Sequence, residues 1–284
     1  RVETSRDAIP ARTTGVGGRG TGSQRLSDAT ELTEQFRLRC EELEARLEGL
    51  PDKPEETAAA TLRSLWHLAA QNALSVEAAG ETPLPPLNRE AELRLRTLIA
   101  QRIAGVPLAH LTGRQRFMGL ELLASRDALI PRRETELVGY AALGLLRELN
   151  AGPEPALLVD VCTGSGNLAV ALAHHEPRTQ VFASDLSAEA VELARRNAHQ
   201  LGLDARVEFR VGDLLQPFDE PRFHGRVDLL VCNPPYISSG KVGKMPAEIS
   251  GYEPRLAFDG GALGVRILQR LIREAPRFLK ADGW

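Results

Sequence analysis

The sequence predicts an α/β chain in which a helical N-terminal part precedes a parallel sheet covered by helices. Apolar residues recur at helical spacing up to about residue 111, and after Pro155 short apolar runs alternate with helical patterns. The 284 residues are 43% hydrophobic and 26% charged, which is typical of a globular protein with two domains. The net charge of −3 argues against a basic nucleic-acid footprint, and no apolar run is long enough to span a membrane.

The N-terminal part divides by composition. Residues 1–27 are rich in Gly, Ser, Thr and Arg and predict a disordered tail. Residues 28–111 predict a small helical bundle, because three apolar stripes at helical spacing run over 36–50, 62–73 and 95–103.

The next segments predict a hairpin and then a doubly wound sheet. Gly113, Gly119 and Pro131 punctuate short apolar runs, so residues 112–134 are predicted to form a hairpin linker. The remaining domain, 135–284, begins with a helix over 137–149. Its predicted strands are 156–161, 180–184, 207–211 and 227–232, its other helices are 166–174, 187–202 and 262–279, and a loop rich in Gly and Pro covers 237–261.

The cysteines are few and widely separated. Cys40, Cys162 and Cys232 are odd in number and lack the spacing of metal ligands, as do the six histidines. We therefore expect a reduced cytoplasmic setting and no metal site.

A glycine turn and an acid at the carboxyl end of each of the first three strands predict a nucleoside pocket. The first strand leads from Asp160 into Cys162, Thr163, Gly164, Ser165 and Gly166, and a helix follows directly. Such a turn lets the backbone approach a ligand and presents unpaired N–H groups. Asp185 follows the second strand, where a carboxylate can accept both ribose hydroxyls, and Asp213 with Leu214 follows the third, where the two can hold an adenine. Each acid alone also fits a helix N-cap or a turn. The turn lacks the dinucleotide GxGxxG pattern, and no GKS or GKT follows it.

The fourth strand ends in Asn233, Pro234, Pro235 and Tyr236, which predict the substrate site. Two prolines fix the backbone, so the Asn233 side chain and the Pro234 carbonyl can present two acceptors to a planar –NH₂ group. Such a site positions a weakly nucleophilic amide nitrogen in line with a sulfonium methyl group without a strong base. Tyr236 can pack on a flat substrate or near the sulfonium.

The glycine turn with Asn233–Tyr236 resembles the class I methyltransferases that use S-adenosylmethionine. The segments 111–113, 117–120, 129–136 and 252–261 extend the resemblance to bacterial peptide-chain release factor glutamine N(5)-methyltransferases. It implies a Rossmann-like sheet, cofactor contacts from Cys162–Gly166, Asp185, Asp213, Leu214 and Asn233, and binding of a glutamine amide by Asn233–Tyr236. It also implies that Phe117 covers the cofactor, that Arg132, Thr135 and Glu136 order the pocket wall, and that 28–111 docks the release factor.

Two residues depart from the family pattern. Cys162 stands at the first glycine of the turn, and because cysteine favours a negative φ we expect the loop to sit slightly differently. Arg133 replaces the second proline of a Pro-Arg-Pro segment. A surface ion pair is an equally good interpretation of Arg132 and Glu136.

Three functions remain in competition. The first is methylation of a glutamine amide in a release factor. The second is methylation of an exocyclic amine of a DNA or RNA base, which the net charge disfavours but which local arginines keep open. The third is a non-catalytic binding module, against which the intact Asn233–Tyr236 motif argues.

The chain ends suggest a fragment. Residue 1 is not Met, and Gly283 lies in a turn that should introduce a further strand. We expect a methyltransferase sheet truncated at its C-terminus, with the strand before Asn233 as an exposed edge. Such a chain is expected to be poorly soluble or weakly active on its own.

Overall fold

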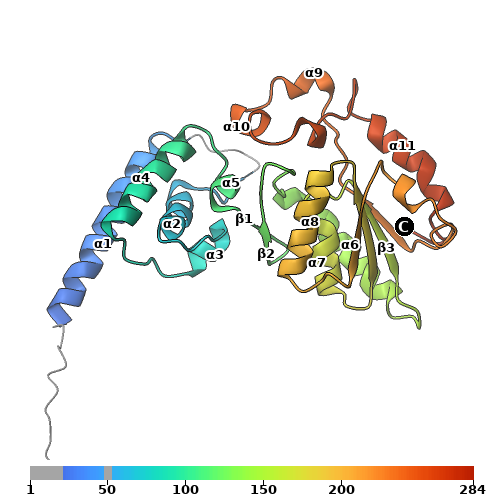
Figure 1. Cartoon of the computed structure of the whole chain (residues 1–284), viewed down its shortest axis with the longest axis horizontal. Helices are drawn as coiled ribbons and strands as arrows, with labels where there is room; N and C mark the ends of the chain where they lie inside the picture. Colours follow the sequence, from blue (N-terminus) through green and yellow to red (C-terminus); the bar gives the residue numbers. More distant parts are fainter. Residues whose placement is uncertain (1–21, 48–52) are drawn as a thin grey trace, which may run out of the picture.

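The computed structural model describes residues 22–47 and 53–284, which form a helical bundle and a sheet domain joined by a hairpin (Figure 1). Most of the predicted disordered tail, residues 1–21, lies outside this description. The prediction is wrong for residues 22–27, because α1 already begins at Gly22 and continues to Glu44. Leu50, the last residue of the first predicted stripe, also lies outside the described residues.

The bundle consists of α1, α2 (Ala58–Ala69), α3 (Val76–Glu81), α4 (Arg89–Ile103) and α5 (Leu108–Thr112). Its core surrounds Trp66, which is fully buried with Leu62, Leu65 and Leu95. Thr57, Ser75 and Asn88 cap α2, α3 and α4 by accepting hydrogen bonds from backbone N–H groups of the first turns. The two helices that the stripes did not predict, α3 and α5, are too short for their periodicity to stand out.

The hairpin pairs β1 (Arg114–Phe117) antiparallel with β2 (Leu120–Leu123), as predicted. Met118 and Gly119 form its two-residue turn, and both have a positive φ, as a twisted hairpin requires. The hairpin contacts both domains. The Glu121 carboxylate accepts from Ser75 N and Oγ of the bundle, and Asn197 Oδ1 of the sheet domain accepts from Leu123 N.

The sheet is parallel and has the strand order β5-β4-β3-β6. The four predicted strands are confirmed as β3 (Leu157–Val161), β4 (Gln180–Asp185), β5 (Val207–Val211) and β6 (Leu229–Cys232). Helices α6 (Arg133–Leu149), α7 (Asn167–His175) and α8 (Ala188–Gln200) cover one face, and α11 (Arg266–Glu274) lies on the other (Figure 1). Strand order reverses between β3 and β6, which is where open α/β sheets bind ligands.

Two apolar layers sandwich the sheet because strand side chains alternate between its faces. Leu158, Val181 and Phe209 pack with α6–α8, whereas Val159 and Val161 pack with Phe218 of the 3₁₀ turn Gln216–Phe218 and with residues of α11. In the described part of the chain, every helix is too short or too polar to cross a bilayer.

The region after β6 differs from the prediction in two ways. The predicted loop 237–261 contains α9 (Ser239–Val242), α10 (Ala247–Ser250) and the 3₁₀ turn Arg255–Ala257, and the last helix is shorter than 262–279. Gly264 has a φ of +76°, which delays the start of α11 to Arg266, and Pro276 lies in the 3₁₀ turn Ala275–Arg277 that follows it.

The outer edge of β6 is partly paired. Trp284 N donates to Asp228 O at 3.0 Å, and Leu230 N donates to Trp284 O at 2.9 Å. A parallel bridge also joins Val227 to Leu279. Among the described strands β6 is still the outermost on its side, but the fully exposed edge expected from the sequence is not what the structure has.

Candidate active site

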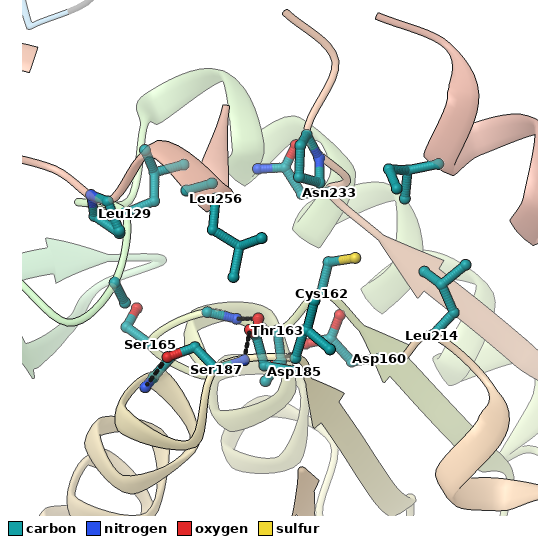
Figure 2. Close-up of a pocket in the computed structure, with 18 of the residues that line it drawn as sticks. Leu129, Asp160, Cys162, Thr163, Ser165, Asp185, Ser187, Leu214, Asn233 and Leu256 are labelled. Atoms are coloured by element: carbon teal, nitrogen blue, oxygen red, sulfur yellow. Dashed lines mark hydrogen bonds between the residues drawn. The ribbon is translucent and has the colours of Figure 1, made fainter. Parts of the chain in front are cut away.

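A cavity of about 370 Å³ opens at the carboxyl ends of the strands. Figure 2 shows Asn233 at one end of it, Asp185 and Ser187 at the other, and Leu129 and Leu256 across from Cys162 and Leu214. Its lining comes from the segments 127–135, 160–168, 185–190, 212–214, 233–235 and 254–270. The cavity therefore lies where the switch point of the sheet predicts a ligand.

The glycine turn forms the cavity floor and keeps a glycine-like backbone even at Cys162. Cys162 has a φ of +58°, and Gly164 and Gly166 have φ values of +56° and +77°. Cys162 thus lacks the negative φ on which the expected displacement of the loop was based, and has the left-handed conformation that a glycine would have there. Gly166 permits close packing as well, since a Cβ there would lie 2.8 Å from Ala194 Cβ.

Asp185 holds this turn against β4. Its Oδ2 accepts from Gly164 N at 2.8 Å and its Oδ1 from Ser187 N at 2.9 Å. Ser187, not Asp185, is the N-cap of α8. Each carboxylate oxygen still has acceptor capacity for a ribose hydroxyl, and burial raises the pKa of Asp185 above its usual value.

Asp160, the acid that the first strand contributes to the predicted nucleoside pocket, is a buried carboxylate in the cavity lining. Thr163 Oγ1 donates to its Oδ2 at 2.5 Å, while Oδ1 has no hydrogen-bond partner among the described residues. Burial raises the pKa of Asp160 to about 7, and the neighbouring Asp185 adds to this. An unpartnered buried acceptor at a cavity wall can accept a hydrogen bond from a ligand, and the bond is strongest when the donor is cationic.

Asp213 and Leu214 line the opposite part of the cavity. Asp213 is paired with Arg270 of α11 through two hydrogen bonds of 2.9 and 3.2 Å. Leu214 is buried with a φ of +49°, and its carbonyl accepts from Ser184 Oγ at 2.8 Å. Sequence reasoning missed Arg270, because charged residues recur along α11 with nothing to single one out.

Asn233 is the best-positioned residue of its motif. Its Nδ2 donates to Thr135 Oγ1 at 3.3 Å, which directs the amide NH₂ at α6 and leaves Oδ1 as the acceptor of this cavity-lining side chain. Pro235 also lines the cavity, whereas Pro234 does not, and Tyr236 is 70% exposed. Gly264 packs against this loop so closely that a Cβ would lie 2.2 Å from Tyr236 O.

Two implied cofactor contacts are not brought to the cavity. Phe117 is 1% exposed and packs in the core with Leu120 and Leu168, so it does not line the cavity. The hairpin turns its aromatic ring inward, where burial stabilises it more than an exposed position would. Gly166 belongs to the turn but lies behind the lining residues.

The segment 129–136 is fastened to its neighbours by carboxylates. Glu253, whose side chain is fully buried, accepts from Arg132 Nη2 at 2.6 Å and from Ile130 N at 2.9 Å. Glu136 accepts from Met118 N at 2.6 Å. The alternative of a surface pair between Arg132 and Glu136 is therefore wrong. Within residues 22–47 and 53–284, no three His, Cys, Asp or Glu side chains gather as metal ligands would.

Comparison with known proteins identifies the family. Residues 138–248 match the family described as the methyltransferase small domain. A release factor glutamine methyltransferase of Koribacter versatilis is 38% identical over 203 residues, which are 71% of this chain and 69% of the relative. The chain belongs to the release factor glutamine methyltransferase family.

A further release factor enzyme and a related glutamine methyltransferase are similarly identical to this chain. The release factor glutamine methyltransferase of Geobacter sulfurreducens is 38% identical over 70% of this chain and 66% of the relative. The ribosomal protein uL3 glutamine methyltransferase of Bradyrhizobium diazoefficiens is 36% identical over 66% of this chain and 58% of the relative. The chain thus spans about two thirds of the length of the release factor relatives. The predicted class I methyltransferase fold and the S-adenosylmethionine cofactor of this family are confirmed.

Proposed function

We propose that the protein transfers a methyl group from S-adenosylmethionine to the side-chain amide nitrogen of a glutamine in a peptide chain release factor. The observation that carries this proposal is the orientation of Asn233. Because Thr135 takes a hydrogen bond from its Nδ2, its Oδ1 is the atom left to accept from a substrate –NH₂ group. The family relationship supports glutamine as the residue that carries that group.

The substrate residues act by position and not by proton abstraction. Asn233 Oδ1 and the Pro234 carbonyl accept the two hydrogens of the glutamine amide, and thereby direct its nitrogen into the cavity. Pro234 and Pro235 keep this loop rigid, because their rings fix φ. The exposed ring of Tyr236 offers a flat surface for the incoming peptide.

The residues of the cavity fit the cofactor in three places. Asp185 accepts from the ribose hydroxyls, and Leu214 supplies an apolar wall for the adenine. Asp160 Oδ1, which is buried and unpartnered among the described residues, would hold the ammonium group of the methionine part. S-adenosylmethionine, when bound there, supplies an electrophilic methyl group on a positively charged sulfur.

The partners and location follow from the same proposal. The bundle formed by α1–α5 would dock the release factor, and the protein would act in the cytoplasm, where its cysteines stay reduced. A nucleic acid is not expected as the direct substrate, because the net charge is −3.

The test is a methyl-transfer assay with labelled S-adenosylmethionine in which release factor, ribosomal protein uL3, DNA and RNA are offered side by side. We expect label in the release factor, on a glutamine that mass spectrometry identifies. In the Asn233→Ala variant, transfer should fall by about 10²–10³-fold while cofactor binding persists. Label in nucleic acid or in uL3 alone would overturn the substrate assignment, and transfer by Asn233→Ala at the parent rate would overturn the role of Asn233.

A further inference from the structure

Four charged side chains meet away from solvent between the helical bundle and the chain that follows the Asn233–Tyr236 motif. Lys53, Glu56, Arg102 and Glu248 are 4%, 8%, 3% and 9% exposed. Arg102 donates to both carboxylates, to Glu248 Oε2 at 2.8 Å and to Glu56 Oε2 at 3.1 Å. Lys53 Nζ lies 3.2 Å from Glu248 Oε1 and 3.8 Å from Glu56 Oε1. We call these four residues the interdomain charge cluster.

The cluster has equal numbers of positive and negative charges, and each member is paired with a member of opposite charge. Burying a charge costs free energy unless it is paired and hydrogen-bonded, and removing one member leaves its partner uncompensated. Burial raises the pKa of Glu56, while Lys53 and Arg102 act in the opposite direction. Three members come from the bundle side of the chain, and Glu248 alone comes from α10 (Figure 1).

Glu248 belongs to the segment 237–261. This segment lines part of the cavity and contacts the loop Asn233–Tyr236, which we call the substrate loop. Leu256, Ala257 and Asp259 line the cavity. Ile237, the residue after Tyr236, donates to Phe258 O at 2.9 Å and accepts from Gly260 N at 2.9 Å. The beginning and end of the segment are thus paired directly beside the Asn233–Tyr236 motif.

The apolar contacts of this segment are modest. Val242, Ile249 and Phe258 form a small buried cluster with Leu129 and Met245 against them, separate from the main layers of the sheet domain. A segment with so small a core depends on its polar anchors for a fixed position. Two of its anchors are buried ion pairs, that of Glu248 with Arg102 of the bundle and that of Glu253 with Arg132.

We propose that Lys53, Glu56 and Arg102 are positioning residues for methyl transfer, which hold Glu248 and so fix the segment 237–261 against the substrate loop. This inference rests on the proposed function. It makes the helical bundle a part of the active-site scaffold as well as a docking domain. The sheet supplies Asp160 and Asp185 for the cofactor, so loss of the cluster affects the protein substrate more than the cofactor.

The central test compares full chains that carry Glu248→Gln, Lys53→Met or both. Glu248→Gln keeps the side-chain shape but leaves the cluster with one excess positive charge, and we expect kcat/KM for release factor to fall about 10- to 100-fold. Its affinity for S-adenosylmethionine should change less than about threefold. The double variant restores charge balance and should recover part of the lost transfer. Glu192→Gln, which breaks the exposed pair of Glu192 with Arg195 on α8 of the sheet domain, is the matched control and should transfer at the parent rate.

Hydrogen exchange gives a second readout that does not depend on catalysis. Glu248→Gln should speed exchange of the Ile237 and Gly260 amides, while amides of β3 and β4 stay protected. If Glu248→Gln does not fold, Arg102→Lys, which keeps the charge but not the two-pronged geometry, takes its place in both measurements.

The outcomes separate this inference from the proposed function. Parent-like transfer and exchange in Glu248→Gln overturn the inference, as does an equal loss of transfer and cofactor affinity without recovery in the double variant. If the parent protein binds cofactor but methylates no release factor, the proposed function fails. Faster exchange confined to 237–261 would then still support the positioning of this segment by the cluster, and unchanged exchange would overturn it.

Discussion

Lowering the pH from 8 to 6 should weaken binding of S-adenosylmethionine about tenfold, because Asp160 loses its charge over that range. Burial raises the pKa of Asp160 to about 7. The ionised fraction in the unliganded protein therefore falls from about nine tenths at pH 8 to about one tenth at pH 6. A bound ammonium group favours the ionised form and lowers this pKa in the complex, so affinity rises with pH through 7.

Isothermal titration calorimetry at pH 6, 7 and 8 measures this slope. Asp160→Asn removes the charge at constant shape and should bind weakly with a flat pH profile. Methylthioadenosine, which lacks the methionine ammonium group, should bind the parent protein with no such slope. Without ligand, the free energy of unfolding has the opposite pH dependence to the cofactor affinity. The raised pKa of Asp160 in the folded state stabilises the protein at low pH, and this contribution is lost as the pH rises through about 7. Equal affinity of the parent at pH 6 and 8, or an unchanged slope in Asp160→Asn, would refute the assignment of Asp160 to the ammonium group.

Three further changes test the geometry of the site. Thr135→Val removes the acceptor that orients Asn233. The kcat for release factor should then fall about tenfold, while the cofactor dissociation constant stays unchanged. An unchanged kcat would contradict this role of Thr135. Cys162→Gly removes the backbone strain that a φ of +58° imposes on a cysteine. Urea denaturation should therefore show a gain of about 1 kcal/mol in the free energy of unfolding. A loss would mean that packing of the thiol outweighs the strain. Gly264→Ala places a Cβ 2.2 Å from Tyr236 O. Thermal unfolding should therefore show a loss of about 1–3 kcal/mol in stability, and transfer should fall as well. Parent-like stability and transfer would count against a rigid substrate loop.

The elements that could be predicted from the sequence are those whose signal is local. Buried parallel strands such as β3 and β6 are continuous apolar runs, and the acids and glycines at their ends are visible without a structure. The same is true of the hairpin, whose turn residues punctuate the chain at Gly119. These signals also placed Asp185, Leu214 and Asn233 in one cavity.

Features that arise from packing could not be predicted in this way. The family resemblance implied that Phe117 covers the cofactor, but the hairpin directs its side chain into the core. The sequence placed Asp160 at the pocket, but it could not show that Oδ1 of this carboxylate has no partner in the described part of the protein. Thr135 and Asn233 are 98 residues apart, and no periodicity links them. The interdomain charge cluster likewise joins Lys53 to Glu248 across 195 residues. In a sequence, such charged residues are expected to lie on the solvent-exposed surface.

The cavity is assembled from six stretches of chain between Asp127 and Arg270, so its parts come together only when the sheet domain has folded. A parallel sheet with crossover helices depends on contacts between distant residues, and these form slowly. A ligand that contacts several of these stretches at once binds the folded chain alone. At a concentration about one hundred times its dissociation constant, it would add about 2.7 kcal/mol to the free energy of unfolding. The supply of the methyl donor would then set how long each copy of this protein survives in the cell, as well as how fast it works.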